Sequence, residues 1–354
     1  MRGVGGSERH LLTLLPALAD RGAEPVFVGL DDSAWDPEPF YRELSVPCVR
    51  LRAPRDLDPK LLVSLRRALR RLEPDVVHTH LVHADLYGAL AARAPVVSTK
   101  HNDDRFRTGS FRYIERVLAR RASRVIAITQ ALARFTVEQV GLPAEKVEVI
   151  HYGLDEPPQA WGENPPALLP EGARVLLAVC RLVEQKGVDV AVRALAAVRH
   201  EHPEAVLVVL GDGPERAALE RVAADLDVAE AVFLPGRVGD VAAWLRRAEL
   251  VVHPVRWEGF GLALLEAMLA ERPAVASAVS SVPEIVVDGE TGLLVPPNDP
   301  TALAAAIARL LSDRVLAERL GSAGLARARS EFSVERMARR TLAVYERAVN
   351  PSAP

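Results

Sequence analysis

Residues Val251–Ser277 read VVHPVRWEGFGLALLEAMLAERPAVAS. A β-branched run ends in His253-Pro254, a loop with Gly259 and Gly261 follows, and an Ala/Leu-rich stretch with helical spacing leads to a second β-branched run. This order predicts a strand, a loop, a helix and a strand, which is the repeating unit of a parallel sheet covered by helices. Because ligands bind at the carboxyl ends of strands in such sheets, the loop is the first candidate site.

The same alternation extends over the whole chain and predicts an α/β protein. The twelve expected strands are residues 24–30, 46–51, 75–79, 95–99, 124–129, 147–150, 174–180, 205–210, 231–234, 250–253, 274–277 and 292–295. Twelve strands are too many for one ordinary sheet. We therefore expect two Rossmann-like domains whose parallel sheets face a deep cleft.

Residues 156–170 form the expected boundary, because this stretch holds five prolines. Proline lacks a backbone donor and disfavours helix in the residue before it. We expect an N-terminal domain at 1–155, a linker at 156–170 and a C-terminal domain at 171–332. The last helical stretch, within 333–354, is expected to cross back to the N-terminal domain.

The loop Gly3-Val4-Gly5-Gly6 should follow a first strand, yet only four residues precede Gly5. The first strand of a doubly wound sheet is central, so its absence leaves the backbone groups of its neighbours unpaired. We expect that the first strand of the N-terminal domain is missing and that a strand-like segment lies upstream of Met1.

Composition excludes several classes of protein. Of 354 residues, 49% are hydrophobic and 26% are charged, which is typical of a folded chain. A net charge of −3 gives no global basic field, so we expect no nucleic acid partner. No apolar run approaches the ~20 residues that span a bilayer. Cys48 and Cys180 lie in apolar runs and are expected to be buried thiols of a cytoplasmic protein.

The charge is unevenly distributed. Residues 60–124 contain 14 Lys/Arg and 6 Asp/Glu, a net charge of +8, which leaves −11 for the rest of the chain. Such a block is typical of solvated helix faces, and it also suits a surface that meets an anionic acceptor or the inner face of a membrane. We expect a cytoplasmic protein and leave peripheral membrane contact open.

Charged side chains follow two strands of the second domain. Glu258 lies in the loop after strand 250–253, and Glu266 lies one to two turns into the next helix; carboxylates in both places can accept hydrogen bonds from sugar or ribose hydroxyls. Arg181 and Lys186 follow strand 174–180, where two cations can neutralise a diphosphate in place of a metal ion. The helix start near Gly261 suits the same anion. Each feature alone is also typical of ordinary loops and surfaces.

Two further loops of the second domain follow strand ends. We interpret Gly211-Asp212-Gly213-Pro214 as a tight turn in preference to a nucleotide contact. Gly236-Arg237-Val238 would present backbone groups to a nucleobase, on position alone.

Histidines follow two strands of the first domain. His80 and His101 should face the expected cleft, where a histidine is as often structural as catalytic. On position we favour a structural role for His80, and we treat His78 and His83 as structural.

Taken together, the motifs resemble those of glycosyltransferase family 4, a group of retaining enzymes with the GT-B fold. The matching segments span nearly the whole chain in the family's order: Gly5-Gly6-Ser7-Glu8-Arg9, His78-Thr79-His80, Lys100-His101, His151-Tyr152-Gly153-Leu154-Asp155, Arg181 with Lys186-Gly187, Gly211-Asp212-Gly213, Glu258-Gly259-Phe260-Gly261 with Glu266, and Asp288-Gly289-Glu290-Thr291-Gly292-Leu293-Leu294-Val295. The chain departs from the family at Tyr152, where asparagine is frequent, and in the missing first strand, which puts the Gly5-Gly6 site in doubt.

The resemblance implies that domain 1–155 is the acceptor side and that domain 171–332 binds the nucleotide-sugar, and it implies roles for the matching residues. His101 would lie near the transferred sugar, Glu258 would bind a sugar hydroxyl, and Glu266 would bind the ribose. The expected catalytic residues are His101, Glu258, Arg181 and Lys186. The expected donor-binding residues are Gly5, Gly6, Arg181, Lys186, Gly211, Arg237, Val238, Glu258, Gly259, Phe260, Gly261, Leu262 and Glu266.

The resemblance further implies a retaining hexosyltransferase that uses a UDP- or GDP-sugar and a carbohydrate or lipid-linked acceptor, with no metal and no cofactor. Two alternatives stay open. One is a nucleotide-sugar epimerase of the same fold, which would act on the donor alone. The other is a non-catalytic partner subunit that keeps the fold.

Overall fold

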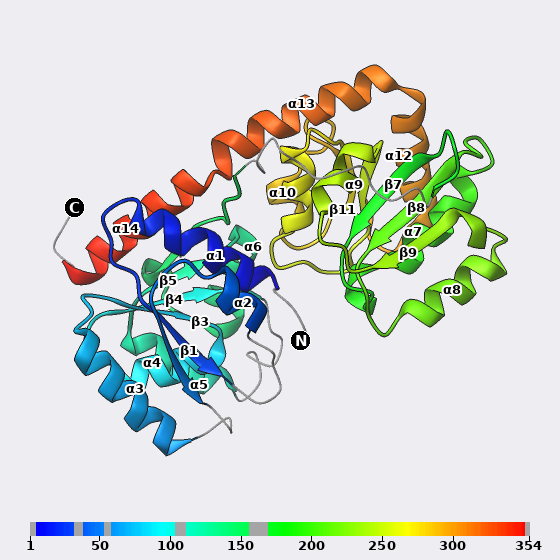
Figure 1. Ribbon diagram of the computed structural model, residues 1–354. Coiled ribbons are helices and arrows are strands. Elements are labelled where there is room, and N and C mark those ends of the chain that lie inside the picture. Colours follow the sequence, from blue (N-terminus) through cyan, green and yellow to red (C-terminus); the bar gives the residue numbers. More distant parts are fainter. Residues whose placement is uncertain (1–4, 32–37, 53–57, 103–110, 156–168, 351–354) are drawn as a thin grey trace. The chain divides into compact units, whose positions relative to one another are not determined.

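The structure is a computed structural model that describes residues 5–31, 38–52, 58–102, 111–155 and 169–350. The chain forms two compact units (Figure 1). Unit 1 is Met1–Gly153 together with Ser333–Pro354, and unit 2 is Leu154–Phe332. The expected linker lies outside the described residues, apart from its last two positions.

Unit 2 contains one sheet of six parallel strands. They are β7 (Arg174–Val179), β8 (Ala205–Leu210), β9 (Val232–Gly236), β10 (Leu250–His253), β11 (Ala274–Ser277) and β12 (Leu293–Val295). Their order is β12-β11-β10-β7-β8-β9. The chain therefore adds strands on one side of β7 and then reverses to the other side, which is the doubly wound order of nucleotide-binding sheets. The switch point lies between β7 and β10.

Helices cover this sheet on both faces. They are α7 (Val188–Val198), α8 (Arg216–Asp225), α9 (Val241–Arg247), α10 (Leu262–Leu269), α11 (Val282–Ile285), α12 (Pro300–Ser312) and α13 (Arg314–Glu331). Helix α7 packs between α8 and α12, and α10 packs against α13. All six residues of β8 are buried, as apolar runs are when a parallel strand has helices on both sides.

Unit 1 contains two sheets of parallel strands. Its strands are β1 (Phe27–Asp31), β2 (Cys48–Arg52), β3 (Val77–His80), β4 (Val96–Lys100), β5 (Ala122–Ala127) and β6 (Val147–Val149). The sheet orders are β1-β2 and β3-β4-β5-β6. Strands β1 and β3 belong to different sheets. Among the described residues these two strands do not pair with each other, and most positions of both are only half-buried, whereas β4 is buried throughout.

Two layers of helices enclose the sheets of unit 1. The helices are α1 (Gly6–Ala19), α2 (Glu38–Glu43), α3 (Pro59–Leu72), α4 (Val82–Ala91), α5 (Phe111–Arg121), α6 (Gln130–Arg134) and α14 (Val334–Val349). Leu14 and Leu18 of α1 share a core with Met337 of α14 and with Val97 and Ile126 of the sheet.

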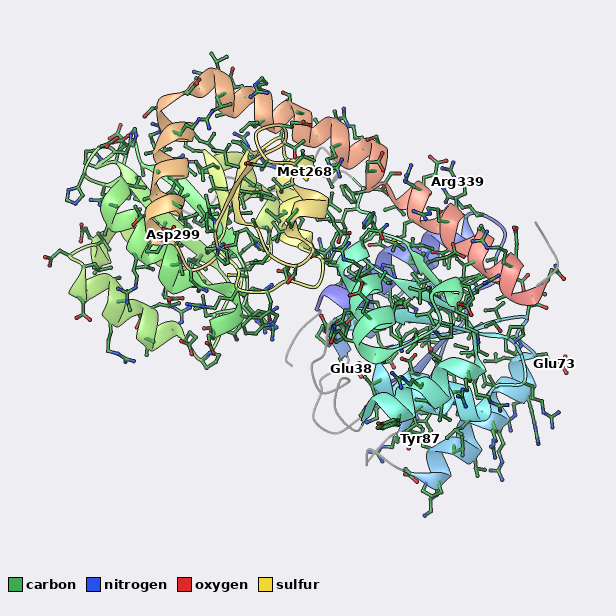
Figure 2. All side chains as sticks on the ribbon, turned by 180° about the vertical axis from the view of Figure 1, so that it is seen from behind. Glu38, Glu73, Tyr87, Met268, Asp299 and Arg339 are labelled. Atoms are coloured by element: carbon green, nitrogen blue, oxygen red, sulfur yellow. The ribbon has the colours of Figure 1, made fainter. Side chains whose placement is uncertain are left out.

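Helices α3 and α4 link the two sheets of unit 1. Leu61, Leu65 and Tyr87 form a cluster against which apolar residues of β1 and β2 pack. Tyr87, labelled in Figure 2, reaches the start of α3, where the Asp58 N–H donates to its hydroxyl at 2.6 Å. No helix in the described part of the chain is long and apolar enough to cross a membrane.

The twelve expected strands are all present, with ends displaced by no more than three residues. The expectation that both cysteines are buried is wrong for Cys48, which is exposed, while Cys180 is half-buried. Strand β2 lies at the edge of a two-stranded sheet, so its alternate residues Cys48, Arg50 and Arg52 face solvent.

Candidate active site

The loops after β7 and β10 begin side by side at the switch point of unit 2. Strands β7 and β10 pair in parallel, with Leu176 opposite Leu250 and Leu177 opposite Val251. Both strands therefore end at the same edge of the sheet, which we call the carboxyl edge. The loop after β7 carries Arg181 and Lys186, and the loop after β10 carries Glu258.

The two loops are joined by backbone contacts. The Arg256 N–H donates to the Gln185 carbonyl at 2.8 Å, and the Gln185 side-chain amide donates to the Trp257 carbonyl at 3.0 Å. Gly187 has φ +60, and a Cβ there would lie 2.0 Å from the Pro254 carbonyl oxygen. Only glycine therefore allows this close approach without displacement.

An arginine fork fixes the same junction from outside. Arg256 donates to the two carboxylate oxygens of Asp189 at 3.0 and 2.8 Å and to the Glu184 carbonyl at 2.6 Å. A bidentate guanidinium–carboxylate pair sets orientation as well as distance. The loop after β10 is therefore held against both the loop after β7 and the first turn of α7.

Inside the junction, Glu258 accepts three hydrogen bonds. Its Oε2 contacts Lys186 Nζ at 2.5 Å and His253 Nε2 at 3.2 Å, and its Oε1 accepts from the Gly259 N–H at 3.0 Å. The side chains are buried, with exposed fractions of 10% for Glu258 and 14% for Lys186. Burial alone raises a carboxyl pKa, but Lys186 and His253 outweigh it and hold the pKa of Glu258 well below its usual range.

Two neighbouring titratable groups, His253 and Cys180, favour their neutral forms. Burial lowers the pKa of His253, against the opposing effect of Glu258. Burial also raises the pKa of the Cys180 thiol to about 11, so this cysteine is not an activated nucleophile. The sequence suggested that Lys186 and Arg181 act as two cations toward a diphosphate. In the structure the charge of Lys186 is already paired, whereas exposed Arg181 has no ion-pair partner among the described residues.

The helix after this loop starts at its expected place. Gly261 has φ +106 and caps α10, and Phe260 is buried beneath the turn. Ser281 donates to the Glu258 carbonyl at 3.0 Å and to the Phe260 carbonyl at 3.1 Å and is fully buried. Sequence reasoning missed this serine; its only signal is a position in the loop between β11 and α11, shortly before Pro283. Glu266 is half-buried in α10, and Leu262 is the first residue of that helix.

The loops after β8 and β9, which carry Gly211 and Arg237, contact neighbouring loops of unit 2. A Cβ at Gly211 would lie 1.9 Å from the Cys180 carbonyl oxygen. The Gly211 N–H donates to the Gly236 carbonyl at 2.8 Å. These contacts agree with the tight-turn interpretation of Gly211. Arg237 is exposed and Val238 is half-buried, so a role of either in nucleobase binding stays a prediction.

In unit 1, rings gather where β3, β4 and β6 end. His101 Nε2 lies 2.9 Å from His80 Nδ1, and His101 Nδ1 is in very short contact with the Tyr152 hydroxyl. The ring of His10, from α1, stacks on Tyr152 with centroids 4.3 Å apart. His78 is held by the Tyr345 hydroxyl and by Thr99, each at 2.7 Å, as its structural interpretation requires.

This ring cluster carries little charge. Burial lowers the pKa of His10 and His78 well below 6.5, and His80 lowers both further. Burial likewise lowers the pKa of His80 to about 4, against the opposing effect of Asp85, and raises that of Tyr152. These histidines are therefore neutral at physiological pH.

Helix α1, which carries His10, begins beside Gly5, and the Glu8 side chain already accepts from the backbone there. The Gly5 N–H donates to the Glu8 carboxylate at 3.1 Å, and Ser7 donates to the same oxygen at 3.0 Å. A negative side chain thus already neutralises this helix start. The assignment of Gly5 and exposed Gly6 to the donor diphosphate stays a prediction.

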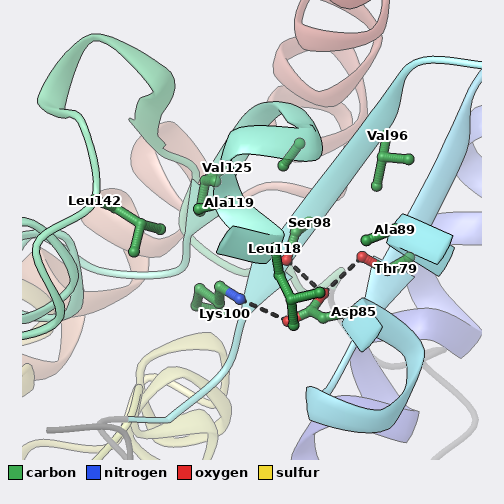
Figure 3. A pocket seen from close by; sticks show the side chains of 11 residues that line it. Thr79, Asp85, Ala89, Val96, Ser98, Lys100, Leu118, Ala119, Val125 and Leu142 are labelled. Carbon is green, nitrogen blue, oxygen red and sulfur yellow. Dashed lines mark hydrogen bonds and ion pairs between the residues drawn. The ribbon is translucent and has the colours of Figure 1, made fainter. Parts of the chain in front are cut away.

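A buried ion pair supports the ring cluster from the other face of the sheet. Figure 3 shows Asp85 of α4, which accepts from Thr79, Ser98 and Lys100, each at 2.6 Å. These side chains line a small cavity, and the exposed fractions of Lys100 and Asp85 are 6% and 4%. Since Thr79 precedes His80 and Lys100 precedes His101, the network fixes the ends of β3 and β4.

Within the described part of the chain, no group of three or more His, Cys, Asp or Glu side chains is arranged to hold a metal ion. Of the predicted catalytic residues, Arg181, Lys186 and Glu258 lie in unit 2, and His101 lies in unit 1 with His80. The sequence did not predict His10 or Tyr152 as members of a common cluster.

Comparison with known proteins places this geometry in a family. Residues 4–156 match the model of Glycosyltransferase Family 4, and residues 162–327 match that of Glycosyl transferases group 1. The D-inositol 3-phosphate glycosyltransferase of Nocardioides sp. is 30% identical over 98% of this chain and 86% of its own. The glycogen synthase of Mycobacterium tuberculosis is 28% identical over 97% of this chain and 91% of its own.

Solved structures agree on the fold. Anabaena HepE in complex with UDP-glucose has a TM-score of 0.83 and 24% identity, and the match covers 98% of each chain. Sucrose-phosphate synthase from Thermosynechococcus elongatus has a TM-score of 0.80 and 24% identity, covering 98% of this chain and 94% of its own. The two Rossmann-like domains are thus those of the GT-B fold, as expected, and the chain belongs to the glycosyltransferases, with a family 4 type N-terminal part and a group 1 type C-terminal part.

Proposed function

We propose that this glycosyltransferase moves a hexose-type sugar from a UDP- or GDP-sugar to an acceptor hydroxyl, with retention of configuration and without a metal ion. The observation that carries the proposal is the buried Glu258, tied to Lys186 and His253 beside the start of α10. This arrangement lies at the switch point of the unit 2 sheet, where doubly wound folds bind nucleotides.

Positive groups at this edge suit a diphosphate. Arg181 is exposed after β7, Lys186 lies in the same loop, and α10 begins at Leu262, where the first backbone N–H groups of a helix lack intrahelical partners. Together they would stabilise the diphosphate as the anomeric C–O bond breaks, which is the task that a metal ion performs elsewhere. This supports metal-independent transfer.

Glu258 is suited to hold the sugar but not to attack it. A carboxylate has about four lone-pair positions, and three of those of Glu258 are taken by Lys186, His253 and the Gly259 N–H. The remaining position can accept from one sugar hydroxyl. A carboxylate so engaged is a poor covalent nucleophile. We therefore propose that the acceptor oxygen bonds to the anomeric carbon on the face that the diphosphate leaves, and that a departing phosphate oxygen takes the acceptor proton.

A UDP-sugar is the first donor to test, because HepE, to which the chain is similar, was solved with UDP and with UDP-glucose. Ligands that bind the folded state raise its melting temperature, so a panel of UDP- and GDP-sugars ranked by thermal shift identifies the donor. Transfer to carbohydrate and lipid-linked acceptors is then measured with and without EDTA, and the product's anomeric configuration is determined by NMR.

Each arm of this experiment has a result that contradicts the proposal. Loss of transfer in EDTA would overturn metal independence, and an inverted product would overturn retention. Conversion of the donor without any acceptor would indicate an epimerase. Donor binding with no turnover on any acceptor would indicate a non-catalytic subunit.

The basic face of unit 1 supports an anionic, lipid-linked acceptor. Arg66, Arg67, Arg70 and Arg71 of α3 are all exposed. Co-sedimentation with vesicles of anionic or zwitterionic lipid tests this contact; we expect binding to the anionic vesicles alone and its loss as salt is raised. Equal binding to both kinds of vesicle, or to neither, would leave the arginines as a solvated helix face.

A further inference from the structure

His101 has no ring nitrogen left for a ligand. Its Nδ1 contacts the Tyr152 hydroxyl, its Nε2 contacts His80 Nδ1 at 2.9 Å, and its exposed fraction is 5%. The family resemblance assigns His101 to the transferred sugar. In this arrangement a direct hydrogen bond from His101 would require one of these two contacts to break.

His80 ends the same chain of hydrogen bonds with one nitrogen open. Its Nδ1 is engaged by His101, whereas its Nε2 has no partner among the described residues, and the ring is partly exposed where β3 ends. The rings of His78 and His101 lie 4.2 and 5.2 Å from it, centroid to centroid. The imidazole of His80 is therefore held in a fixed orientation before any ligand arrives.

A second nitrogen in the cluster also lacks a partner. His10 Nδ1 is buried and makes no hydrogen bond in the described part of the chain, and its ring centroid lies 5.8 Å from that of His80. Buried polar atoms in native cores are nearly always satisfied, because an unpaired one costs free energy. Two incompletely satisfied histidines side by side are typical of a binding site and not of a finished core.

We propose that His80 Nε2 hydrogen-bonds a hydroxyl group of the acceptor, and that His101 and Tyr152 are positioning residues that hold His80 in place. This inference rests on the proposed transfer to an acceptor hydroxyl and deepens it by naming the residue that binds that group. The assignment exchanges the structural role expected for His80 with the ligand-binding role expected for His101.

The chemistry of the cluster selects a hydroxyl over an anion. A neutral imidazole carries one donor and one acceptor nitrogen, and its neighbours decide which is which. A hydroxyl both donates and accepts, so it pairs with Nε2 in either tautomer. An anion pairs with only one tautomer, and the rings around His80 offer it no positive charge.

Steady-state kinetics with the acceptor and donor varied separately tests the proposal. In His80→Ala we expect the acceptor KM to rise about three- to tenfold, the loss of one neutral hydrogen bond, with the donor KM unchanged. His80→Gln should recover part of the loss because its amide also pairs with a hydroxyl. Tyr152→Phe should raise the acceptor KM less, and exposed His200→Ala in unit 2 should change nothing. An unchanged acceptor KM in His80→Ala, or a raised donor KM, overturns the proposal.

A labelling experiment tests whether His80 is the accessible, hydroxyl-binding histidine. Because it needs no turnover, its result does not depend on the proposed transfer activity. Diethylpyrocarbonate acylates accessible neutral imidazole nitrogens, and mass spectrometry of the full chain locates the product. We expect modification of His80 but not of His78 or His101, and slower modification in concentrated D-glucose but not in inorganic phosphate. Faster labelling of His101 than of His80, protection by phosphate, or protection by neither probe would overturn the proposal.

Discussion

At the carboxyl edge of the unit 2 sheet, a lysine and a glutamate lie 2.5 Å apart, whereas the same edge in unit 1 carries a cluster of histidines and tyrosines. Burial keeps His10, His78 and His80 of this cluster neutral. The two sheets belong to the same fold type, but one carboxyl edge presents charged side chains and the other presents neutral rings. A charged edge suits a nucleoside diphosphate, and a neutral edge suits a hydroxyl.

The frameworks behind these edges also differ. In unit 2 the first strand, β7, pairs on both sides, so the two site loops leave one continuous sheet. In unit 1 the described strands form two sheets joined through α3 and α4. There the side chain of Asp85 ties α4 to the ends of the neighbouring strands β3 and β4. The comparison therefore predicts that loss of the buried ion pair costs both stability and transfer in unit 2, whereas loss of the Asp85 network in unit 1 costs stability alone.

The largest effect is expected from Lys186→Ala. The change leaves the Glu258 carboxylate buried without its cation, which should lower the free energy of unfolding by about 3–5 kcal/mol and abolish transfer. Urea unfolding and a transfer assay measure the two effects. The double variant Lys186→Met, Glu258→Gln should recover most of the stability but no transfer, because it leaves no unpaired charge buried in the site.

A matched control is Arg314→Ala, which breaks a fully exposed pair with Glu318 and should change neither quantity measurably. Normal turnover in Lys186→Ala would contradict the charged role of the unit 2 edge. So would full recovery of transfer in the double variant.

The positions of strands and site loops could be predicted from the sequence, because β-branched runs mark strand ends and ligands bind where strands end. Side-chain pairing could not. Lys186 and Glu258 are 72 residues apart, and His101 and Tyr152 are 51 apart, so no local pattern shows that they meet. The sequence therefore identified two cations toward a diphosphate, one of which proved to be paired. Cys48 was misjudged for the same reason, since the edge position of β2 depends on strand pairing.

In unit 1, Asp85→Ala should cause a comparable loss of stability without abolishing transfer. Lys100 would lose its carboxylate partner, and Thr79 and Ser98 would lose their common acceptor. The expected cost is about 3–5 kcal/mol, and Asp85→Leu with Lys100→Met should be nearly neutral. Unfolding in urea measures the cost, and transfer is assayed where each variant is folded. If the stabilised double variant lost transfer entirely, the network would belong to the active site and the contrast between the units would fail.

The stabilities of the two units should fall over different pH ranges on acidification. The pKa of His80 is lowered from 6.5 to about 4, chiefly by burial, so its contribution to stability is full above pH 6.5 and is lost as pH falls toward 4. His10, His78 and His101 face this ring from three elements, and Asp85 opposes the shift. The pKa of Glu258 is held below its ordinary 4.5, so its contribution is full above pH 4.5 and is lost only below that.

Unit 1 should therefore weaken first on acidification. His80→Gln should flatten the fall in unfolding free energy between pH 6.5 and 4, and Glu258→Gln should flatten it only below pH 4.5. Urea unfolding across this range measures both slopes. The same slope in wild type and in His80→Gln between pH 6.5 and 4 would show that the unit 1 cluster does not carry the neutral rings on which the comparison rests.

The smallest effect is expected at Ser281, which shapes the charged edge without carrying charge. Its hydroxyl donates to the carbonyls of Glu258 and Phe260, and it is fully buried. Ser281→Ala removes the donor that these two carbonyls share, at a cost of about 1 kcal/mol. The loop that presents Glu258 should loosen, so the donor KM should rise while the acceptor KM stays constant. Ser281→Cys, which keeps a weak donor, should lie between the two. A change in the acceptor KM alone would show that this loop serves the acceptor, and the division of labour between the two edges would have to be redrawn.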